Sequence, residues 1–230
     1  MTNFVDILAI GAHPDDVDFG AGAILLKMAA KGRKIAILDV TSGEMGTHGN
    51  AKIREKESLK AGKFLKADRF FLHLSDTKLG DTLEIRQELT SWIRKLKPKL
   101  VLAPDFQKEM NHPDHAALGL AVRAAARFAR FPKILPDLKP HRVEGVLHYH
   151  YPTNRMPDFL FDVSDFTEKW VQVMKCFESQ LKTLDYIDRN LKAASYFGSL
   201  VGVPYAQGLS KHNPILVGDL LEVSKGTLEI

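Results

Sequence analysis

The chain has 230 residues, of which 45% are apolar and 26% charged, and its formal net charge is +4 at pH 7. This length and apolar content allow a sizeable core, so we expect a single domain over residues 1–230. Its lysines and arginines are scattered, which disfavours nucleic acid as a partner and fits at most an anionic small substrate. Cys176 is alone, so no intramolecular disulfide can form. Charges interrupt every apolar run and the N-terminus lacks a basic leader, so we expect a soluble cytoplasmic protein with no membrane partner.

Short apolar runs alternate with longer segments of helical periodicity, which predicts a Rossmann-like α/β fold: a mostly parallel sheet with helices on both faces. The expected strands are 4–10, 34–40, 69–74, 99–103, 145–149 and 159–163. The expected helices are about 20–31, 51–66, 82–97, 115–130, 166–181 and 185–201. The remaining segments 131–140 and 204–214 are rich in loop-forming residues, and we expect a surface loop and an irregular tail.

Two clusters of histidine and aspartate follow two of the expected strands. The run 11–16, Gly-Ala-His-Pro-Asp-Asp, follows the first strand, and the run 112–115, His-Pro-Asp-His, comes after the fourth. In a doubly wound sheet of order 3-2-1-4-5, the first and fourth strands are neighbours, and ligands bind at their carboxyl ends. The topology therefore predicts that both clusters line one crevice.

The spacing within these clusters suits a metal ion. His13 and Asp16 are three residues apart at the entry to a helix, so both side chains can bind one ion. Either His112 or His115 would supply a third ligand, and the residues alone leave both open. Two histidines and one carboxylate leave a coordination position for water, as in catalytic zinc sites. Asp15 is the natural base for that water, if Asp16 is the ligand.

Other interpretations compete with a metal site. Aspartates commonly cap helices, so the first cluster alone could serve only to begin a helix. A nucleotide-binding oxidoreductase would also have a strand, a turn and a helix here, with Asp39 holding a ribose hydroxyl. Its glycine fingerprint is absent, because Pro14 and two acids stand where a pyrophosphate needs uncharged backbone. A non-catalytic metal-binding or interaction module is the third alternative, which absence of bound zinc and of any hydrolysis would favour.

A glycine-rich segment, 41–50, ends the second expected strand at the same edge of the sheet. Its glycines permit close approach of the backbone to a ligand, and Arg54 begins the next helix within reach of the crevice. The same pattern is also typical of a flexible loop with a solvated arginine.

The motifs resemble those of the PIG-L/LmbE-like family of zinc-dependent N-acetylglucosaminyl deacetylases. The matching runs are 12–16, Thr41 with Gly43 and Glu44, 53–57 around Arg54, 112–115, 140–144 and 205–208. Within that family the chain is most similar to the bacillithiol-biosynthesis deacetylases, which remove acetate from N-acetylglucosaminyl-malate.

The resemblance implies a role for each residue of the two clusters. It makes His13, Asp16 and His115 the ligands of one zinc ion, with iron(II) as an alternative in the cell, and Asp15 the general base. His112, held by Asp114, would stabilise the oxyanion and assist departure of the amine.

Beyond the clusters, the resemblance implies that Arg54 and Glu44 bind the substrate and that Tyr186 contacts the sugar. Relatives form trimers or hexamers, which implies a homo-oligomer. Asn111 stands where the bacillithiol enzymes often have arginine, Gln207 replaces a usual glutamate, and the segment 180–186 is shorter. Because the first and third of these differences bear on the aglycone pocket, chitobiose and inositol conjugates remain alternative substrates.

Overall fold

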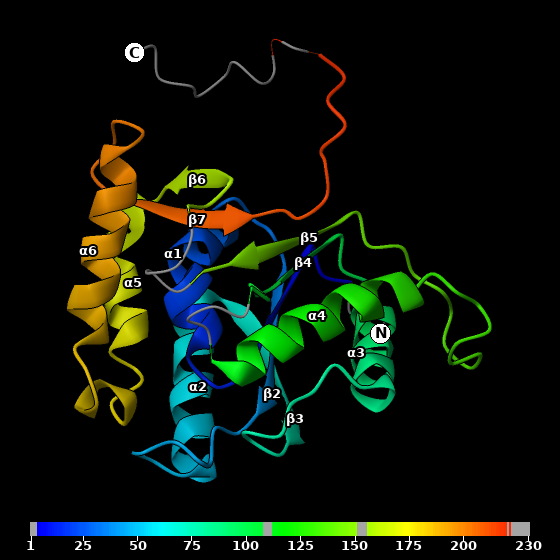
Figure 1. Ribbon diagram of the computed structural model, residues 1–230. Coiled ribbons are helices and arrows are strands. Elements are labelled where there is room, and N and C mark those ends of the chain that lie inside the picture. Colours follow the sequence, from blue (N-terminus) through cyan, green and yellow to red (C-terminus); the bar gives the residue numbers. More distant parts are fainter. Residues whose placement is uncertain (1–3, 108–111, 151–155, 220, 222–230) are drawn as a thin grey trace.

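A seven-stranded sheet forms the centre of the computed structural model (Figure 1), which describes residues 4–107, 112–150, 156–219 and 221. The strands are β1 (Ile7–Gly11), β2 (Ile35–Thr41), β3 (Ala67–Leu74), β4 (Leu100–Pro104), β5 (Gly145–Tyr149), β6 (Phe159–Asp162) and β7 (Ala206–Ser210). The α-helices are α1 (Asp16–Ala30), α2 (Ala51–Leu65), α3 (Leu83–Leu96), α4 (Pro113–Phe128), α5 (Thr167–Met174) and α6 (Tyr186–Ser199). The strand order is β3-β2-β1-β4-β5-β7-β6, and β7 runs antiparallel to both of its neighbours. The predicted α/β class is confirmed, and β1 and β4 are neighbours.

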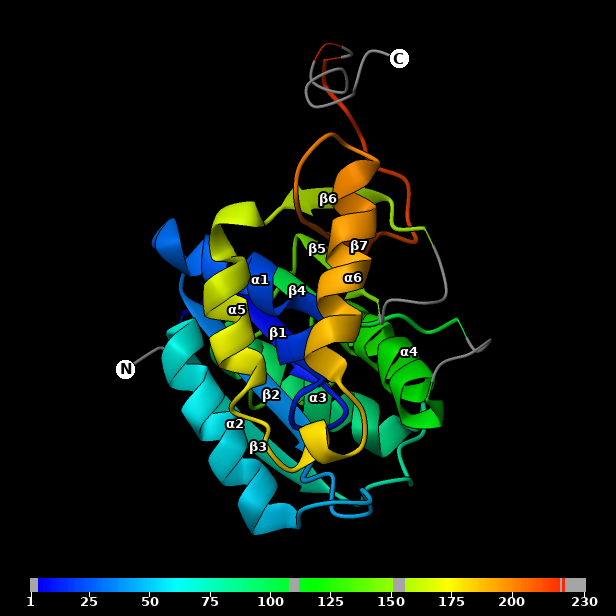
Figure 2. The ribbon, with the colours of Figure 1, turned by 90° about the vertical axis from the view of Figure 1, so that its left-hand side faces the viewer.

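Alternation along the strands sends side chains into two separate cores. Ile7 and Ala9 of β1 belong to one core, while Leu8 and Ile10 belong to the other. Helices α1, α2, α5 and α6 cover the first core, and Figure 2 shows them in front of the sheet. Helices α3 and α4 cover the second core. Because the central strands are buried on both faces, they appear in the sequence as continuous apolar runs.

Helix α1 begins at Asp16, earlier than the expected start at residue 20. Its first turn carries Asp16 and Asp18, where the helix dipole favours negative charge. Gly20 and Gly22 lower the helix propensity of this segment, yet a Cβ atom at these positions would approach Tyr149 to 2.4 Å and Trp170 to 2.9 Å. The two glycines therefore serve close packing inside a helix.

The segment 204–214, expected as an irregular tail, contains strand β7, so that prediction is wrong. The strand forms because its backbone pairs with β5 on one side and β6 on the other. Gln207 ties it to α1: its Oε1 accepts the Ile24 amide at 3.1 Å and its Nε2 donates to the Phe19 carbonyl at 3.0 Å. A neutral amide can make both bonds, whereas a carboxylate only accepts.

The prediction of one helix over 166–181 is also wrong, because the observed helix is shorter. Helix α5 ends at Met174, and the chain then turns so that Cys176 and Phe177 enter the core covered by α1 and α5. A short 3-10 turn, Gln180–Lys182, follows before α6.

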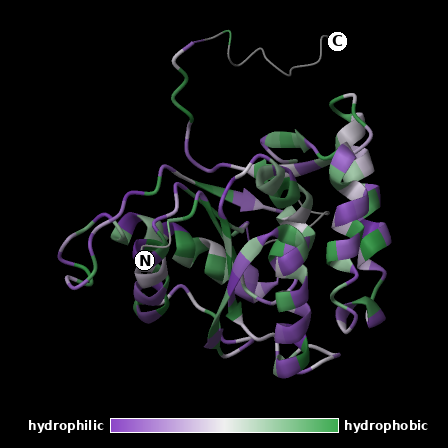
Figure 3. Cartoon of the chain, turned by 180° about the vertical axis from the view of Figure 1, so that it is seen from behind, coloured by the Kyte–Doolittle hydropathy of each residue, from purple (hydrophilic) through white to green (hydrophobic). Residues whose placement is uncertain are grey.

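The outer helices are amphipathic, and Figure 3 shows purple and green alternating around them. None of the helices in the described part of the chain is long and apolar enough to span a bilayer.

Candidate active site

The loop between β1 and α1 holds the first histidine–aspartate cluster at the carboxyl end of β1. The His13 amide donates to Asp16 Oδ2 at 2.8 Å, so the Asp16 side chain folds back over the loop. Asp15 is the N-cap of α1 with a φ of 113°. This left-handed backbone costs a non-glycine residue on the order of 1–3 kcal/mol, and such strain is found mostly at functional sites. His13, Asp15 and Asp16 are all buried.

Three donor atoms from the two clusters converge on one point. His13 Nδ1 lies 3.4 Å from Asp16 Oδ2, and His115 Nε2 lies 3.1 Å from the same oxygen. The two ring nitrogens are 3.3 Å apart. A tetrahedral ion with bonds of ~2.0–2.1 Å separates its ligand atoms by about 3.3 Å, so the three atoms fit such an ion. The crevice between β1 and β4 thus brings His13, Asp16 and His115 together.

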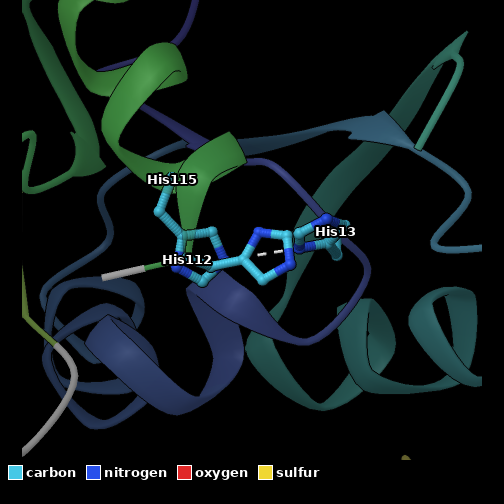
Figure 4. A group of neighbouring side chains, drawn as sticks. All are labelled: His13, His112 and His115. Carbon is cyan, nitrogen blue, oxygen red and sulfur yellow. Dashed lines mark hydrogen bonds between the residues drawn. The ribbon is translucent and has the colours of Figure 1, made fainter. Parts of the chain in front are cut away.

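His112 lies beside this group, as Figure 4 shows. Its ring meets that of His13 edge-on, with ring centroids 5.0 Å apart. The Asp114 amide donates to His112 Nδ1 at 3.3 Å, which caps α4 and leaves the proton of the neutral imidazole on Nε2. Burial, together with His13 and His115, lowers the pKa of His112 below its ordinary value. His112 is therefore a neutral donor at the edge of the group.

Two further carboxylates stand behind His13. Asp76 Oδ1 lies 2.9 Å and Asp114 Oδ2 lies 3.4 Å from His13 Nε2. A carboxylate in this position orients a metal-binding histidine and makes it more basic. Burial lowers the pKa of His13, but Asp16, Asp114 and Asp76 outweigh it and raise that pKa, so these carboxylates favour a positive charge at the ring, which a metal ion on Nδ1 would supply in place of a proton. Sequence analysis missed Asp76, although its place after the third strand, at the same edge of the sheet, was an available signal.

The contacts of the Asp114 carboxylate differ from those expected, because it does not hold the His112 ring by a hydrogen bond. Its Oδ2 accepts the Thr77 amide at 2.8 Å and faces His13. The observed hydrogen bond to His112 comes from the Asp114 backbone instead. The side chain turns toward the segment after β3, so Asp114 acts on the opposite histidine.

Arg54 of α2 connects the two loops of the site. Its Nη1 donates to the Gly43 carbonyl at 2.8 Å and its Nη2 donates to the Pro14 carbonyl at 2.7 Å. Nη2 also lies 3.4 Å from Asp15 Oδ2, and Arg54 is only 4% exposed. Gly43, with a φ of 62°, leaves room for this contact, since a Cβ there would lie 1.8 Å from Nη1. Burial raises the pKa of Asp15 to about 8, and Arg54 opposes the shift.

The other expected substrate residues lie in different surroundings. Glu44 is exposed, and its Oε1 accepts the Asp76 amide at 2.9 Å. Tyr186 begins α6 and stacks on Phe19 of α1 with ring centroids 5.5 Å apart, so its ring packs against the core. Asn111 lies outside the described residues.

The fold and this donor set define an α/β protein with a histidine–aspartate site suited to a metal ion. The family model for GlcNAc-PI de-N-acetylase, PIG-L, matches residues 8–126, and the chain belongs to that family. Its members are metal-dependent hydrolases that act on amide bonds, so the protein is an N-deacetylase.

Similar proteins cover nearly the whole chain. Diacetylchitobiose deacetylase of Thermococcus kodakarensis is 30% identical over 220 residues, 88% of this chain and 81% of that one. The probable N-acetyl-alpha-D-glucosaminyl L-malate deacetylase 2 of Bacillus anthracis is 30% identical over 200 residues, 80% and 84% of the two chains. The crystal structure of the conserved protein TT1542 from Thermus thermophilus matches with a TM-score of 0.88 at 32% identity, over 94% and 99%. These matches disfavour the nucleotide-binding oxidoreductase.

Proposed function

We propose that the protein uses one zinc ion to hydrolyse the N-acetyl group of an N-acetylglucosamine conjugate, releasing acetate and the free amine. The observation that carries this proposal is the convergence of His13 Nδ1, Asp16 Oδ2 and His115 Nε2 at mutual distances of 3.1 to 3.4 Å. Two imidazoles and one carboxylate are the ligand set of zinc sites that keep a position open for water. The related chitobiose and glucosaminyl malate deacetylases support an acetylated amino sugar as the substrate.

The residues around the donor group divide the hydrolysis between them. Bound zinc would polarise the acetamide carbonyl and acidify a water molecule. Asp15 takes the proton from the attacking water, since its buried carboxylate stands beside the proposed ligands His13 and Asp16. His112 donates a hydrogen bond from Nε2 to the oxygen on which negative charge develops, and this bond assists departure of the amine. The proton that Asp15 has taken passes to the nitrogen as the C–N bond breaks, so a neutral amine and acetate are released. Asp76 and Asp114 hold the His13 ring in place.

As the particular substrate we propose N-acetylglucosaminyl-malate. The motif resemblance and the Bacillus anthracis relative support this choice. Arg54 and Glu44 are the proposed substrate contacts beside the loops of the site, and Tyr186 is a further candidate on α6.

Diacetylchitobiose is the second candidate, and one observation favours it. Arg54 is only 4% exposed, it donates to the Gly43 and Pro14 carbonyls, and its Nη2 lies 3.4 Å from Asp15 Oδ2, so its charge already faces groups of the protein and little of it is accessible to a malate carboxylate. A neutral sugar does not need an accessible cation. The Thermococcus kodakarensis relative supports this second candidate.

The test is acetate release by the purified protein, with its metal content measured in the same preparation. We expect stoichiometric zinc or iron(II), activity that chelation abolishes and zinc restores, and a higher kcat/KM for N-acetylglucosaminyl-malate than for diacetylchitobiose or the inositol conjugate. Acetate release without any metal would refute the zinc proposal. A higher kcat/KM for diacetylchitobiose would refute only the choice of malate.

We further propose a cytoplasmic homo-oligomer, a trimer or hexamer, from the resemblance. Light scattering on the purified protein tests the assembly, and a monomer at micromolar concentration would refute it.

A further inference from the structure

A positively charged groove lies beside α4, away from the catalytic crevice. It has a volume of about 580 Å³ between the outer side of α4, strand β5 and the chain that follows β7. Its wall carries four permanent cations and two histidines: Arg123, Arg127, Arg130, Lys211, His148 and His212. Among the described residues that line it, Glu144 is the only acid. Four of the scattered basic residues of the sequence thus gather at one place in the fold.

The cations of the groove have no acidic partner in the part of the chain that the structure describes. Arg123, Arg127, Arg130 and Lys211 form no ion pair with any carboxylate of the described residues. Arginines in the last turn of a helix often serve to neutralise the helix dipole. Here the buried Arg94 already fills that role, since its Nε donates to the Ala129 carbonyl and its Nη2 to those of Phe128 and Phe131. The arginines on the groove side are therefore not required to cap α4.

The inner wall of the groove is held in place before any ligand arrives. The Arg123 guanidinium lies over the Phe106 ring, 4.7 Å from its centroid, and the His212 ring lies 4.0 Å from the same centroid. His212 Nε2 is in turn 2.8 Å from Asp105 Oδ1. A preorganised guanidinium loses less entropy on binding an anion than a solvated one does.

Asp105, His148 and His212 place possible ligand atoms within 4.8 Å of one another, which raises the question of a second metal ion. The surroundings oppose that interpretation. Asp105 already pairs with His212, and Arg123 and Lys211 line the same groove, where they repel a divalent cation. The charge of the groove selects an anion.

We propose that this groove binds a small organic molecule bearing two or more phosphate groups, at a site separate from the catalytic crevice. The three arginines extend over about 10 Å of α4 and the turn after it, so one phosphate could engage only part of the set. Guanidinium groups bind phosphate oxygens through paired hydrogen bonds, which gives the site its selectivity for phosphate over chloride. Arg123 lies about 12 Å along α4 from His115, so a ligand here leaves the catalytic group accessible.

The test is calorimetric titration of the metal-loaded protein at low ionic strength with fructose 1,6-bisphosphate, and separately with ADP. We expect one site per chain for at least one probe, no binding of fructose, and an affinity that falls as sodium chloride is added. Tighter binding of the first probe identifies a sugar phosphate as the ligand class, and tighter binding of the second identifies a nucleotide. Absence of binding by both probes at millimolar concentration would overturn the proposal.

The double variant Arg127→Gln/Arg130→Gln locates the site. Both side chains are exposed, so the variant should fold. We expect its affinity for the probe to fall at least about tenfold, the lower bound that the loss of a single charged contact would give. The matched control Lys63→Gln/Arg189→Gln removes two exposed cations elsewhere and should stay within about twofold of the wild type. Unchanged affinity in the first variant would overturn the proposal. So would loss of binding in His13→Ala, since it would place the phosphates on the catalytic metal.

Discussion

Asp16 and Asp18, both in the first turn of α1, belong to two buried charge clusters of opposite design. Asp18 and Asp39 meet Arg69 of β3 in what we call the Arg69 cluster. Arg69 Nη1 and Nη2 donate to the two oxygens of Asp18 at 2.9 and 2.8 Å, and its Nε donates to Asp39 Oδ2 at 2.7 Å. The other cluster, which we call the catalytic cluster, consists of His13, Asp16 and His115. There Asp16 Oδ2 instead faces the ring nitrogens of the two histidines.

The difference lies in the source of the compensating positive charge. In the Arg69 cluster the chain supplies its own cation, and the guanidinium satisfies both carboxylates. In the catalytic cluster the ligand atoms point at one another, an arrangement that a cation from solution would stabilise most. A buried carboxylate that the chain neutralises with its own cation depends on that cation for the stability of the fold, whereas buried ligand atoms that converge without a cation of the chain between them mark a binding site. The predictions below test this distinction, from the largest expected effect to the smallest.

Removing a metal ligand should abolish both metal binding and activity while the fold survives. His13→Ala and Asp16→Ala each delete one of three converging atoms, and two ligands hold zinc poorly. Metal analysis and acetate release measure the outcome. The control His141→Ala, whose ring contacts the Pro98 carbonyl, should retain both properties. Full metal occupancy in both variants would contradict the ligand assignment.

Removing the internal cation should destabilise the fold instead. Arg69→Met leaves Asp18 and Asp39 buried without their cation, although Asp39 keeps its hydrogen bond from Ser58 Oγ, and we expect a loss of about 3–5 kcal/mol in the free energy of unfolding. Urea denaturation measures the loss. A triple variant that also carries Asp18→Asn and Asp39→Asn should recover part of it. A loss below about 1 kcal/mol, the scale of an exposed ion pair, would show that Arg69 is not needed to neutralise Asp18 and Asp39.

Replacing the proposed base should separate chemistry from metal binding. Asp15→Asn keeps a residue that tolerates the left-handed backbone, so the loop should persist. We expect a fall in kcat of on the order of 10²-fold or more with zinc retained, because the amide cannot accept the proton from water. Steady-state kinetics and metal analysis decide the matter. Loss of zinc in this variant would make Asp15 a ligand.

The two histidines of the second cluster should behave differently. His112→Ala removes a donor to the developing oxyanion and should lower kcat by roughly 10²-fold with the metal retained. His115→Ala removes a converging atom and should lower metal affinity as well. Metal titration of the two variants distinguishes the roles. Equal loss of metal in both would make His112 a ligand as well, and loss in His112→Ala alone would reverse the assignment.

The buried residue His148 gives the smallest predicted effect, because the effect of burial on its pKa outweighs that of the neighbouring Asp105. Burial lowers the pKa of His148 to about 4, below its value of about 6.5 in the unfolded chain, so the unfolded state binds more protons between these values. His148 therefore contributes stability above pH 6.5 that is lost as the pH falls toward 4. Relative to His148→Gln, we expect the wild type to lose about 2 kcal/mol between pH 8 and pH 5. Equal pH dependence of the two proteins, in urea denaturation, would contradict the shift.

The sequence by itself determined the α/β class and the meeting of the two clusters. Apolar runs identified β1 and β4, and parallel strands place their carboxyl ends at one edge of the sheet, so a histidine after each strand reaches the same crevice. The choice of His13, Asp16 and His115 as a group required little more than spacing, topology and family resemblance. These signals depend only on local sequence and on strand order, so they can be recognised in the sequence without a three-dimensional structure.

The tertiary structure alone decided what depends on contacts between distant segments. Strand β7 has no apolar alternation of its own and exists because β5 and β6 flank it. Asp76 reaches His13 only because β3 ends beside the site, and Arg54 turns inward because Gly43 leaves space for its guanidinium. No residue type predicts such contacts, since each depends on how several elements pack at once. The path of a side chain is settled only when its neighbours from other strands and helices are in place.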